Sequence, residues 1–258
     1  MKRLLLASAA LFSFVAIASV IAANAQATSQ GASKKAPEPA QSWNGYYAGI
    51  HLGAAFPHLH LNDIGDGSRS FANAGTAGQG FDASGGGVAF GGAQVGYDFQ
   101  KDSLVYGLQG DIGWMNLHAN KVDPGSTDSQ TKVGLNRGMY QNATGRFGKA
   151  AGSALFYVKG GLALYDGKES FVTNGSGATH SDTDVFPGWV AGGGAEIHLG
   201  SNWSGSVEYL HQGFAYRTFN VVTGTGSFPF EEQLSTDSVS LGFNYRFGGG
   251  AAKATAKH

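Results

Sequence analysis

The chain has 258 residues, no cysteine, 42 glycines, and 17 Lys and Arg against 18 Asp and Glu. The absence of cysteine excludes a disulfide framework and thiol chemistry, and a formal charge of −1 offers no basic surface for nucleic acid. Glycine exceeds twice its usual share of ~7%, which together with 12% aromatic residues is typical of tightly packed strands.

The first 25 residues predict a secretory signal peptide. Met1-Lys2-Arg3 gives a positive start, an apolar run extends from Leu4 to Ala23, and Ala23-Asn24-Ala25 supplies small residues for cleavage after Ala25. The alternative is a single membrane-spanning helix, because the run is almost long enough to cross a bilayer. Its three serines and the A-x-A site favour the signal peptide. Residues 26–42 carry almost no large apolar side chain and predict a flexible linker.

From residue 43 onward, eight segments alternate apolar and polar residues with the period of a β-strand. The predicted strands cover about 43–54, 87–100, 104–116, 139–148, 154–165, 189–198, 206–209 and 239–247. Short turns are expected at 101–103, 149–153 and 200–202, and they alternate with long polar loops, among them 166–185 and a last one ending near Asp237. Barrels of the bacterial outer membrane have short periplasmic turns and long extracellular loops in this way.

The direction in which each face points follows from charge and aromatic position. The polar faces carry few, nearly balanced charges, whereas a water-facing barrel exterior would carry many more. We therefore expect these polar faces to line the lumen with Asp98, Asp111, Arg146, Lys159, Glu196, Glu208 and Arg246. Aromatic residues at the strand ends predict two membrane-interface girdles. The short-turn girdle comprises Tyr97, Phe99, Tyr106, Phe147, Phe156, Trp203 and Phe247, and the other comprises Trp114, Tyr165 and Trp189.

The predicted fold class is all-β: an eight-stranded antiparallel up-and-down transmembrane β-barrel over residues 43–247, followed by a flexible tail at 248–258. With the amino terminus inside, the four long loops are extracellular. A closed barrel also pairs every backbone group in lipid, which an open sheet cannot do.

Several motifs resemble the small outer-membrane β-barrel proteins of alphaproteobacteria, a group similar in architecture to the OmpA membrane domain and to opacity proteins. The motifs lie at residues 43–49 (WNGYYAG), 92–98 (GAQVGYD), 157–161 (YVKGG), 202–210 (NW and VEYL) and 239–247 (VSLGFNYRF). The resemblance covers the chain from Trp43 to Phe247. It implies a location in the outer membrane, contact with its lipid, and biogenesis with periplasmic chaperones and the barrel-assembly machinery.

One departure from this family concerns the carboxyl end. Members normally end on the terminal aromatic residue that the assembly machinery reads, whereas this chain continues through residues 248–258. Phe247 would therefore serve as an internal signal.

A pair of histidines in the first long loop is the main ligand candidate. His58 and His60, with Asp63 nearby, could hold a metal or haem, and the resemblance makes this relevant because haem-binding members exist. An H-x-H pair is also common by chance, and no further ligands follow at suitable spacing, so a solvated loop is the preferred interpretation. His51 and His198 fall on the lumen face, where we expect hydrogen-bonded interior groups rather than ligands.

The lumen charges allow two interpretations. They could form a selectivity ring in a narrow pore for small solutes, or a salt-bridged plug, because eight strands leave an interior just wide enough for side chains to fill. The plug is preferred, since an unpaired buried charge is costly.

An enzyme is not expected. Asp111, Glu196 and Glu208 could suggest hydrolysis by two carboxylates, but they sit on different strands without a clustered nucleophile and base. The glycine blocks at 85–87 and 192–194 lack the lysine and helix of a phosphate-binding loop.

The sequence thus predicts a structural and surface-interacting outer-membrane barrel with no cofactor and no nucleic-acid partner. An extracellular or host ligand at the loops is the partner left open. The alternatives are the narrow pore and a haem-binding surface receptor.

Overall fold

The computed structural model describes residues 42–64, 80–84, 86–115, 131–173, 179–223 and 226–247. The predicted signal peptide, the linker up to residue 41 and the tail at 248–258 lie outside these ranges. Within them, no helix has the length and apolarity needed to cross a membrane.

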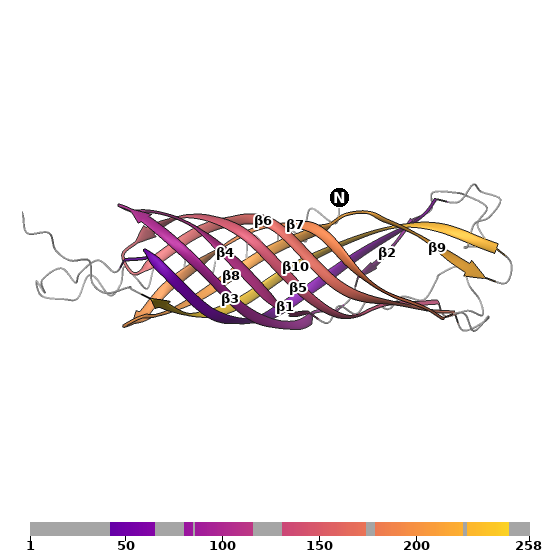
Figure 1. The fold of residues 1–258 in the computed structure, drawn as a ribbon, viewed down its shortest axis with the longest axis horizontal. Coiled ribbons are helices and arrows are strands. Elements are labelled where there is room, and N and C mark those ends of the chain that lie inside the picture. Colours follow the sequence, from indigo (N-terminus) through magenta and orange to yellow (C-terminus); the bar gives the residue numbers. More distant parts are fainter. Residues whose placement is uncertain are drawn as a thin grey trace, which may run out of the picture.

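The described residues form ten antiparallel β-strands (Figure 1). In chain order they are β1 (Gly45–Asp63), β2 (Gly80–Ser84), β3 (Val88–Lys101), β4 (Leu104–Met115), β5 (Thr131–Ala151), β6 (Ala154–Thr173), β7 (Thr179–Gly200), β8 (Trp203–Phe214), β9 (Arg217–Thr223) and β10 (Gly226–Phe247).

Eight of these strands close into a barrel, as the alternating pattern predicts. Each of β1, β3, β4, β5, β6, β7, β8 and β10 pairs with the next, and β10 returns to pair with β1. The remaining two are short: β2 pairs with the far part of β1, and β9 pairs with the first part of β10. The predicted eight-stranded antiparallel barrel is therefore confirmed, with two small additions beyond its long-loop end.

The register of the barrel is strongly staggered. Following paired residues from Tyr46 through each strand in turn leads back to β1 at Phe56, ten residues further along. Such a stagger accompanies strands tilted by roughly 35–45° from the barrel axis. The tilt is visible in Figure 1. A layer of interior side chains at one height is therefore drawn from strands distant in sequence.

The strands at the long-loop end are longer than the sequence predicts. The predicted loop at 166–185 is largely a continuation of β6 and β7, which pair with each other as far as Val172 and Thr179. Likewise β5 starts at Thr131, and β10 starts at Gly226 instead of near Asp237. Backbone pairing needs no apolar alternation, so polar segments above the membrane continue the hairpins without the pattern that marks a membrane strand.

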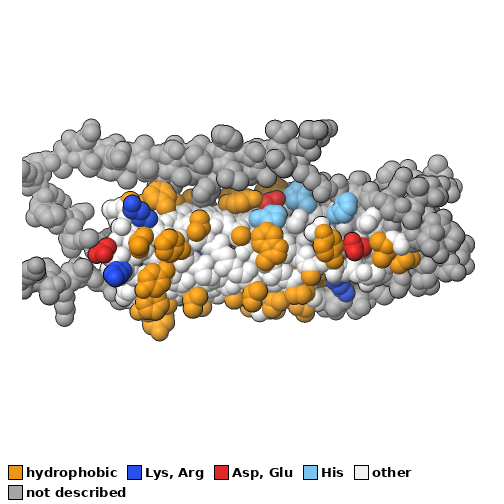
Figure 2. All heavy atoms as spheres, turned by 90° about the horizontal axis from the view of Figure 1, so that it is seen from above, with side chains coloured by type: hydrophobic (Ala, Val, Ile, Leu, Met, Phe, Trp, Pro, Cys, Tyr) orange, Lys and Arg blue, Asp and Glu red, His pale blue; other side chains and the backbone are white. Residues whose placement is uncertain are grey.

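The outer wall of the barrel carries many exposed apolar side chains, as a lipid-facing surface would. The side chains of Leu108, Leu162 and Leu241 are 71%, 69% and 69% exposed. Figure 2 shows such hydrophobic side chains distributed along the wall, with few charged ones among them. Trp114 and Trp189 are exposed at the long-loop side, as expected for a girdle, but Tyr165 is 1% exposed and buried. Its predicted placement in the girdle is wrong. Tyr165 lies an even number of residues from Lys159 on the same strand, so both side chains face the interior.

The interior contains two apolar clusters, one at each end of the charged residues. At the short-turn end, Trp43, Val105, Leu155 and Tyr157 pack together. Toward the long-loop end a larger cluster contains Ala55, Leu59, Phe90, Met115, Tyr140, Ala163, Tyr165, Phe186, Val190, Leu210, Phe214 and Leu234. The inner face is therefore not only small and polar, as the alternation suggests, but in large part a packed apolar core.

Candidate functional site: the charged barrel interior

Four charged side chains form a balanced cluster, here called the lower layer, near the short-turn end. The Arg146 guanidinium donates two hydrogen bonds to Asp98, of 2.8 and 2.6 Å, and one of 3.0 Å to Glu196. Arg246 donates to Glu196 at 3.0 Å and also to Asp98. All four residues are buried. Two cations and two anions thus bridge one another in a closed ring of charge-assisted hydrogen bonds.

Aromatic rings hold the two arginines of the lower layer in place. The guanidinium carbons of Arg146 and Arg246 each lie 4.9 Å from the centre of the Tyr47 ring, and Arg146 also lies 4.8 Å from the Tyr157 ring. A cation over an aromatic face is attracted by the ring quadrupole, more strongly away from water. The rings therefore stabilise the charged form of both arginines without adding further charge.

Trp43 closes the lower layer from below. It is fully buried, its backbone N–H donates to Gln100 Oε1 at 2.6 Å, and its carbonyl accepts a 2.7 Å hydrogen bond from Arg246. The ring packs against His198, with ring centres 4.0 Å apart. The residue just before the first strand thereby forms a floor to the charged interior.

A second cluster, here called the upper layer, contains one lysine and two carboxylates. Lys159 Nζ donates to Glu208 Oε1 at 3.0 Å and lies 3.7 Å from Asp111 Oδ2. Tyr157 donates its O–H to Glu208 Oε2 at 2.9 Å, and Gln109 Nε2 donates to Asp111 Oδ1 at 2.6 Å. This layer is buried as well, but its formal charge is not balanced.

The small residues between these side chains are required by close packing. A Cβ atom on Gly96 would lie 2.4 Å from the Tyr47 ring and 2.7 Å from the carbonyl oxygen of Leu108. A Cβ on Gly107 would lie 2.4 Å from Asp98 Oδ1. All three distances are shorter than any side chain tolerates, so glycine at these positions gives the large charged and aromatic groups their space.

The structure brings all seven predicted lumen charges together in these two layers. It also adds neutral partners that charge alone does not reveal, including Ser204 and Asn244, which donate to Glu196 at 2.6 and 3.1 Å. The alternation of faces along a strand could have identified these neutral residues. Each of them lies on the same face of its strand as that strand's charged residues. Tyr47 and Trp43 could have been found in the same way.

The predicted ligand pair His58 and His60 lies in strand β1 and not in a loop. His58 is on the outer face, where its Nε2 lies 3.4 Å from Asp237 Oδ2, and His211 Nδ1 contacts the other oxygen of Asp237 at 2.9 Å. Asp63 is the last residue of β1. Across the described residues, no group of three or more His, Asp or Glu side chains has the geometry of a metal site. Haem or metal binding by this pair stays a prediction.

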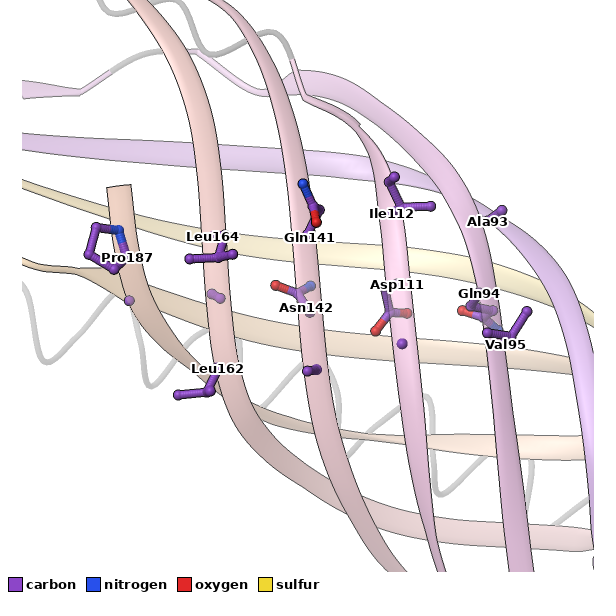
Figure 3. Close-up of a pocket in the computed structure, with 14 residues that line it drawn as sticks. Ala93, Gln94, Val95, Asp111, Ile112, Gln141, Asn142, Leu162, Leu164 and Pro187 are labelled. Atoms are coloured by element: carbon purple, nitrogen blue, oxygen red, sulfur yellow. The ribbon is translucent and has the colours of Figure 1, made fainter. Parts of the chain in front are cut away.

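The outer wall is hollowed over strands β3 to β7. A depression of about 470 Å³ is lined by small residues such as Ala93, Gly110 and Ala143 and edged by exposed Ile112 and Leu162 (Figure 3). The labelled side chains Gln94, Asp111 and Asn142, on three successive strands, belong to the buried interior directly behind it.

The family model and two curated relatives agree with this architecture. Residues 12–247 match the family model described as outer membrane protein beta-barrel domain. The chain is 29% identical to the 31 kDa outer-membrane immunogenic protein of Brucella melitensis over 96% of this chain and 100% of that protein. It is 27% identical to the 22 kDa outer membrane protein of Rhizobium leguminosarum, covering 81% of each. Among solved structures, the outer membrane protein OprG of Pseudomonas aeruginosa has a TM-score of 0.48 and 10% identity, covering 81% of this chain and 100% of that one.

Proposed function

The chain belongs to the outer membrane protein β-barrel domain family, and on that premise we propose that it acts as a structural and surface-interacting protein of the outer membrane with a plugged lumen. The proposal has two parts. The barrel interior serves stability, and the long connections on the extracellular side carry whatever recognition the protein performs.

The plug is supported by one arrangement: the charges are enclosed between apolar clusters. Below the lower layer stands fully buried Trp43, and above the upper layer stands the large cluster that includes Phe90, Met115 and Leu210. An ion crossing the barrel would have to displace both clusters and break charge pairs that hold one another. In a barrel of eight strands the interior is wide enough only for side chains.

The surface role is supported by the asymmetry of the connections. Two residues separate β3 from β4, β5 from β6 and β7 from β8, whereas at the opposite end 16 residues separate β1 from β2 and 15 separate β4 from β5. Function is concentrated on loops held by a rigid scaffold. The Brucella relatives are named immunogenic proteins, which agrees with exposure of such loops at a cell surface.

A catalytic role receives no support from the interior carboxylates. Glu196 is fully buried and accepts hydrogen bonds from Arg146 and Arg246. Carboxylates held in this way stabilise a fold, and a reacting group needs access to its substrate.

Conductance in a planar bilayer tests the plug. Purified protein in a defined lipid bilayer is expected to give no steady openings, whereas a general porin measured in parallel verifies the assay. Stable openings whose occurrence does not depend on salt concentration would show that the lumen conducts, and the narrow pore would then replace the plug.

A further inference from the structure

The two charged layers together hold one carboxylate more than they hold cations. Their four buried carboxylates, Asp98, Asp111, Glu196 and Glu208, face three buried cations, Arg146, Lys159 and Arg246. Glu232, another buried carboxylate among the described residues, lies outside both layers and is the register partner of Arg217. The lower layer is balanced, so the excess negative charge belongs to the upper layer. An uncompensated buried charge costs several kcal/mol, and the layer therefore needs one more positive charge.

The hydrogen bonds of His51 are complete with its imidazole neutral, so this side chain need not supply the charge. Glu196 can only accept, so Asn244 donates to it through Nδ2 and presents Oδ1 to Gln94 Nε2 at 2.5 Å. Gln94 Oε1 then faces His51 Nδ1 at 3.1 Å, which must carry the hydrogen. In the neutral imidazole, Nε2 of His51 then accepts from the hydroxyl of Tyr140. The imidazole is thus satisfied in its neutral form.

A small cavity lies beside the unbalanced carboxylates. Its volume is about 10 Å³, room for roughly one occupant of the size of water. Asp111, Glu208, Asn142, Tyr140 and Ser240 contribute polar groups to its lining, and Phe90 and Met115 are among its apolar neighbours. Lys159 is not among the lining residues.

One oxygen in this cavity wall has no hydrogen bond. Asp111 is 7% exposed, and its Oδ2 accepts from no donor among the described residues, Lys159 Nζ being 3.7 Å away. Its other oxygen is taken by Gln109. A buried carboxylate oxygen without a donor is an open position for a ligand that carries positive charge.

We propose that the cavity between Asp111 and Glu208 binds one monovalent alkali cation. The charge fits, since a single positive charge neutralises the upper layer, whereas a divalent ion would leave it positive next to Phe90 and Met115. The donors fit because carboxylate, hydroxyl and amide oxygens are the ligands of hard cations. The volume of the cavity fits an alkali ion without its hydration shell. The site does not depend on whether the lumen is closed to conduction.

The first experiment measures cation-dependent stability of the full-length protein in detergent. The midpoint of heat unfolding, read from the mobility difference of folded and unfolded barrel on gels, is compared in sodium, potassium and choline chloride at constant ionic strength. We expect the midpoint to be about 2–4 °C higher with sodium or potassium than with the large choline ion. Equal midpoints in all three salts would overturn the proposal.

Matched variants separate the cavity from a general salt effect. Asp111→Asn removes the excess charge with nearly unchanged shape and is expected to abolish the difference between the three salts. Asp237→Asn removes a carboxylate from the outer wall, outside the cavity, and is expected to retain it. A salt difference that persists in Asp111→Asn would mean that the ion binds elsewhere.

Diffraction gives a reading that does not depend on the variants folding. Crystals of the wild-type protein grown in rubidium chloride are expected to show an anomalous peak between the carboxylates of Asp111 and Glu208. Data that show no peak in this cavity at full rubidium concentration would contradict the proposal.

Discussion

The two charged layers inside the barrel are built from the same kinds of residue but differ in balance. In the lower layer every carboxylate oxygen of Asp98 and Glu196 accepts at least one hydrogen bond, and each anion contacts two arginines. In the upper layer two carboxylates share Lys159, and one oxygen of Asp111 has no donor. The comparison separates a charge cluster that stabilises itself from one that needs an additional positive charge.

The largest effect is expected from removing an anion of the balanced layer. Glu196→Ala leaves Arg146 and Arg246 with one carboxylate between them in a fully buried position. We expect the free energy of unfolding to fall by about 3–5 kcal/mol, measured by urea titration of the protein in lipid vesicles. A loss below about 1 kcal/mol would show that the lower layer is less dependent on its pairing than its geometry indicates.

Removing the single cation of the upper layer is expected to cost about 3 kcal/mol, at the low end of the range for a broken buried pair. Lys159→Met leaves Asp111 and Glu208 facing each other without a cation. Adding Glu208→Gln in the same chain should restore part of the stability, since the double variant carries one buried charge instead of two. The same urea titration provides the measurement. If the double variant is less stable than the single one, the charges of this layer do not control its energy.

The packing around the lower layer is tested by Gly96→Ala. The added methyl group would meet the Tyr47 ring, which supports both arginines, so we expect a loss of about 1–3 kcal/mol. Gly110→Ala is the matched control, because a Cβ there would find its nearest neighbour 4.0 Å away at the Asn142 carbonyl oxygen. Equal stability of the two variants would mean that Tyr47 can move without loss.

The smallest effect is expected from Asp111→Asn. The change removes the excess charge of the upper layer and keeps an oxygen for Gln109. The expected change in unfolding free energy in choline chloride is below about 1 kcal/mol, because the loss of one charge-assisted hydrogen bond is offset by relief of the uncompensated charge. A loss as large as that for Glu196→Ala would remove the distinction between the two layers.

Strand number and the direction of each face could be predicted from the sequence because a strand repeats every two residues. The low number of charges on the polar faces identified them as the inner faces. The two-residue repeat then placed Arg146 with Asn142, and Glu208 with Ser206, on the inner side of their strands. The pairs themselves could not be predicted. Arg146 reaches Asp98 and Glu196 because of the ten-residue stagger of the closed barrel, and no local pattern encodes that stagger.

The apolar part of the interior was missed for a different reason. The rule that the inside of an outer-membrane barrel is polar applies to wide barrels filled with water. In eight strands the inside is a packed core, so Phe90 and Leu210 occupy inner positions like those of a soluble protein. The same reasoning explains Trp43. It precedes the first strand, but it lies an even number of residues from Tyr47 and faces the interior like that residue.

The lower layer draws on residues from the whole circumference of the sheet. Asp98 comes from β3, Arg146 from β5, Glu196 from β7, and Arg246 from β10, the last of the described strands in chain order. Until β10 meets β1, Asp98 and the carbonyl of Trp43 both lack their hydrogen bond from Arg246. The seam of the barrel is therefore fastened inside as well as along the backbone, because one arginine joins its two sides.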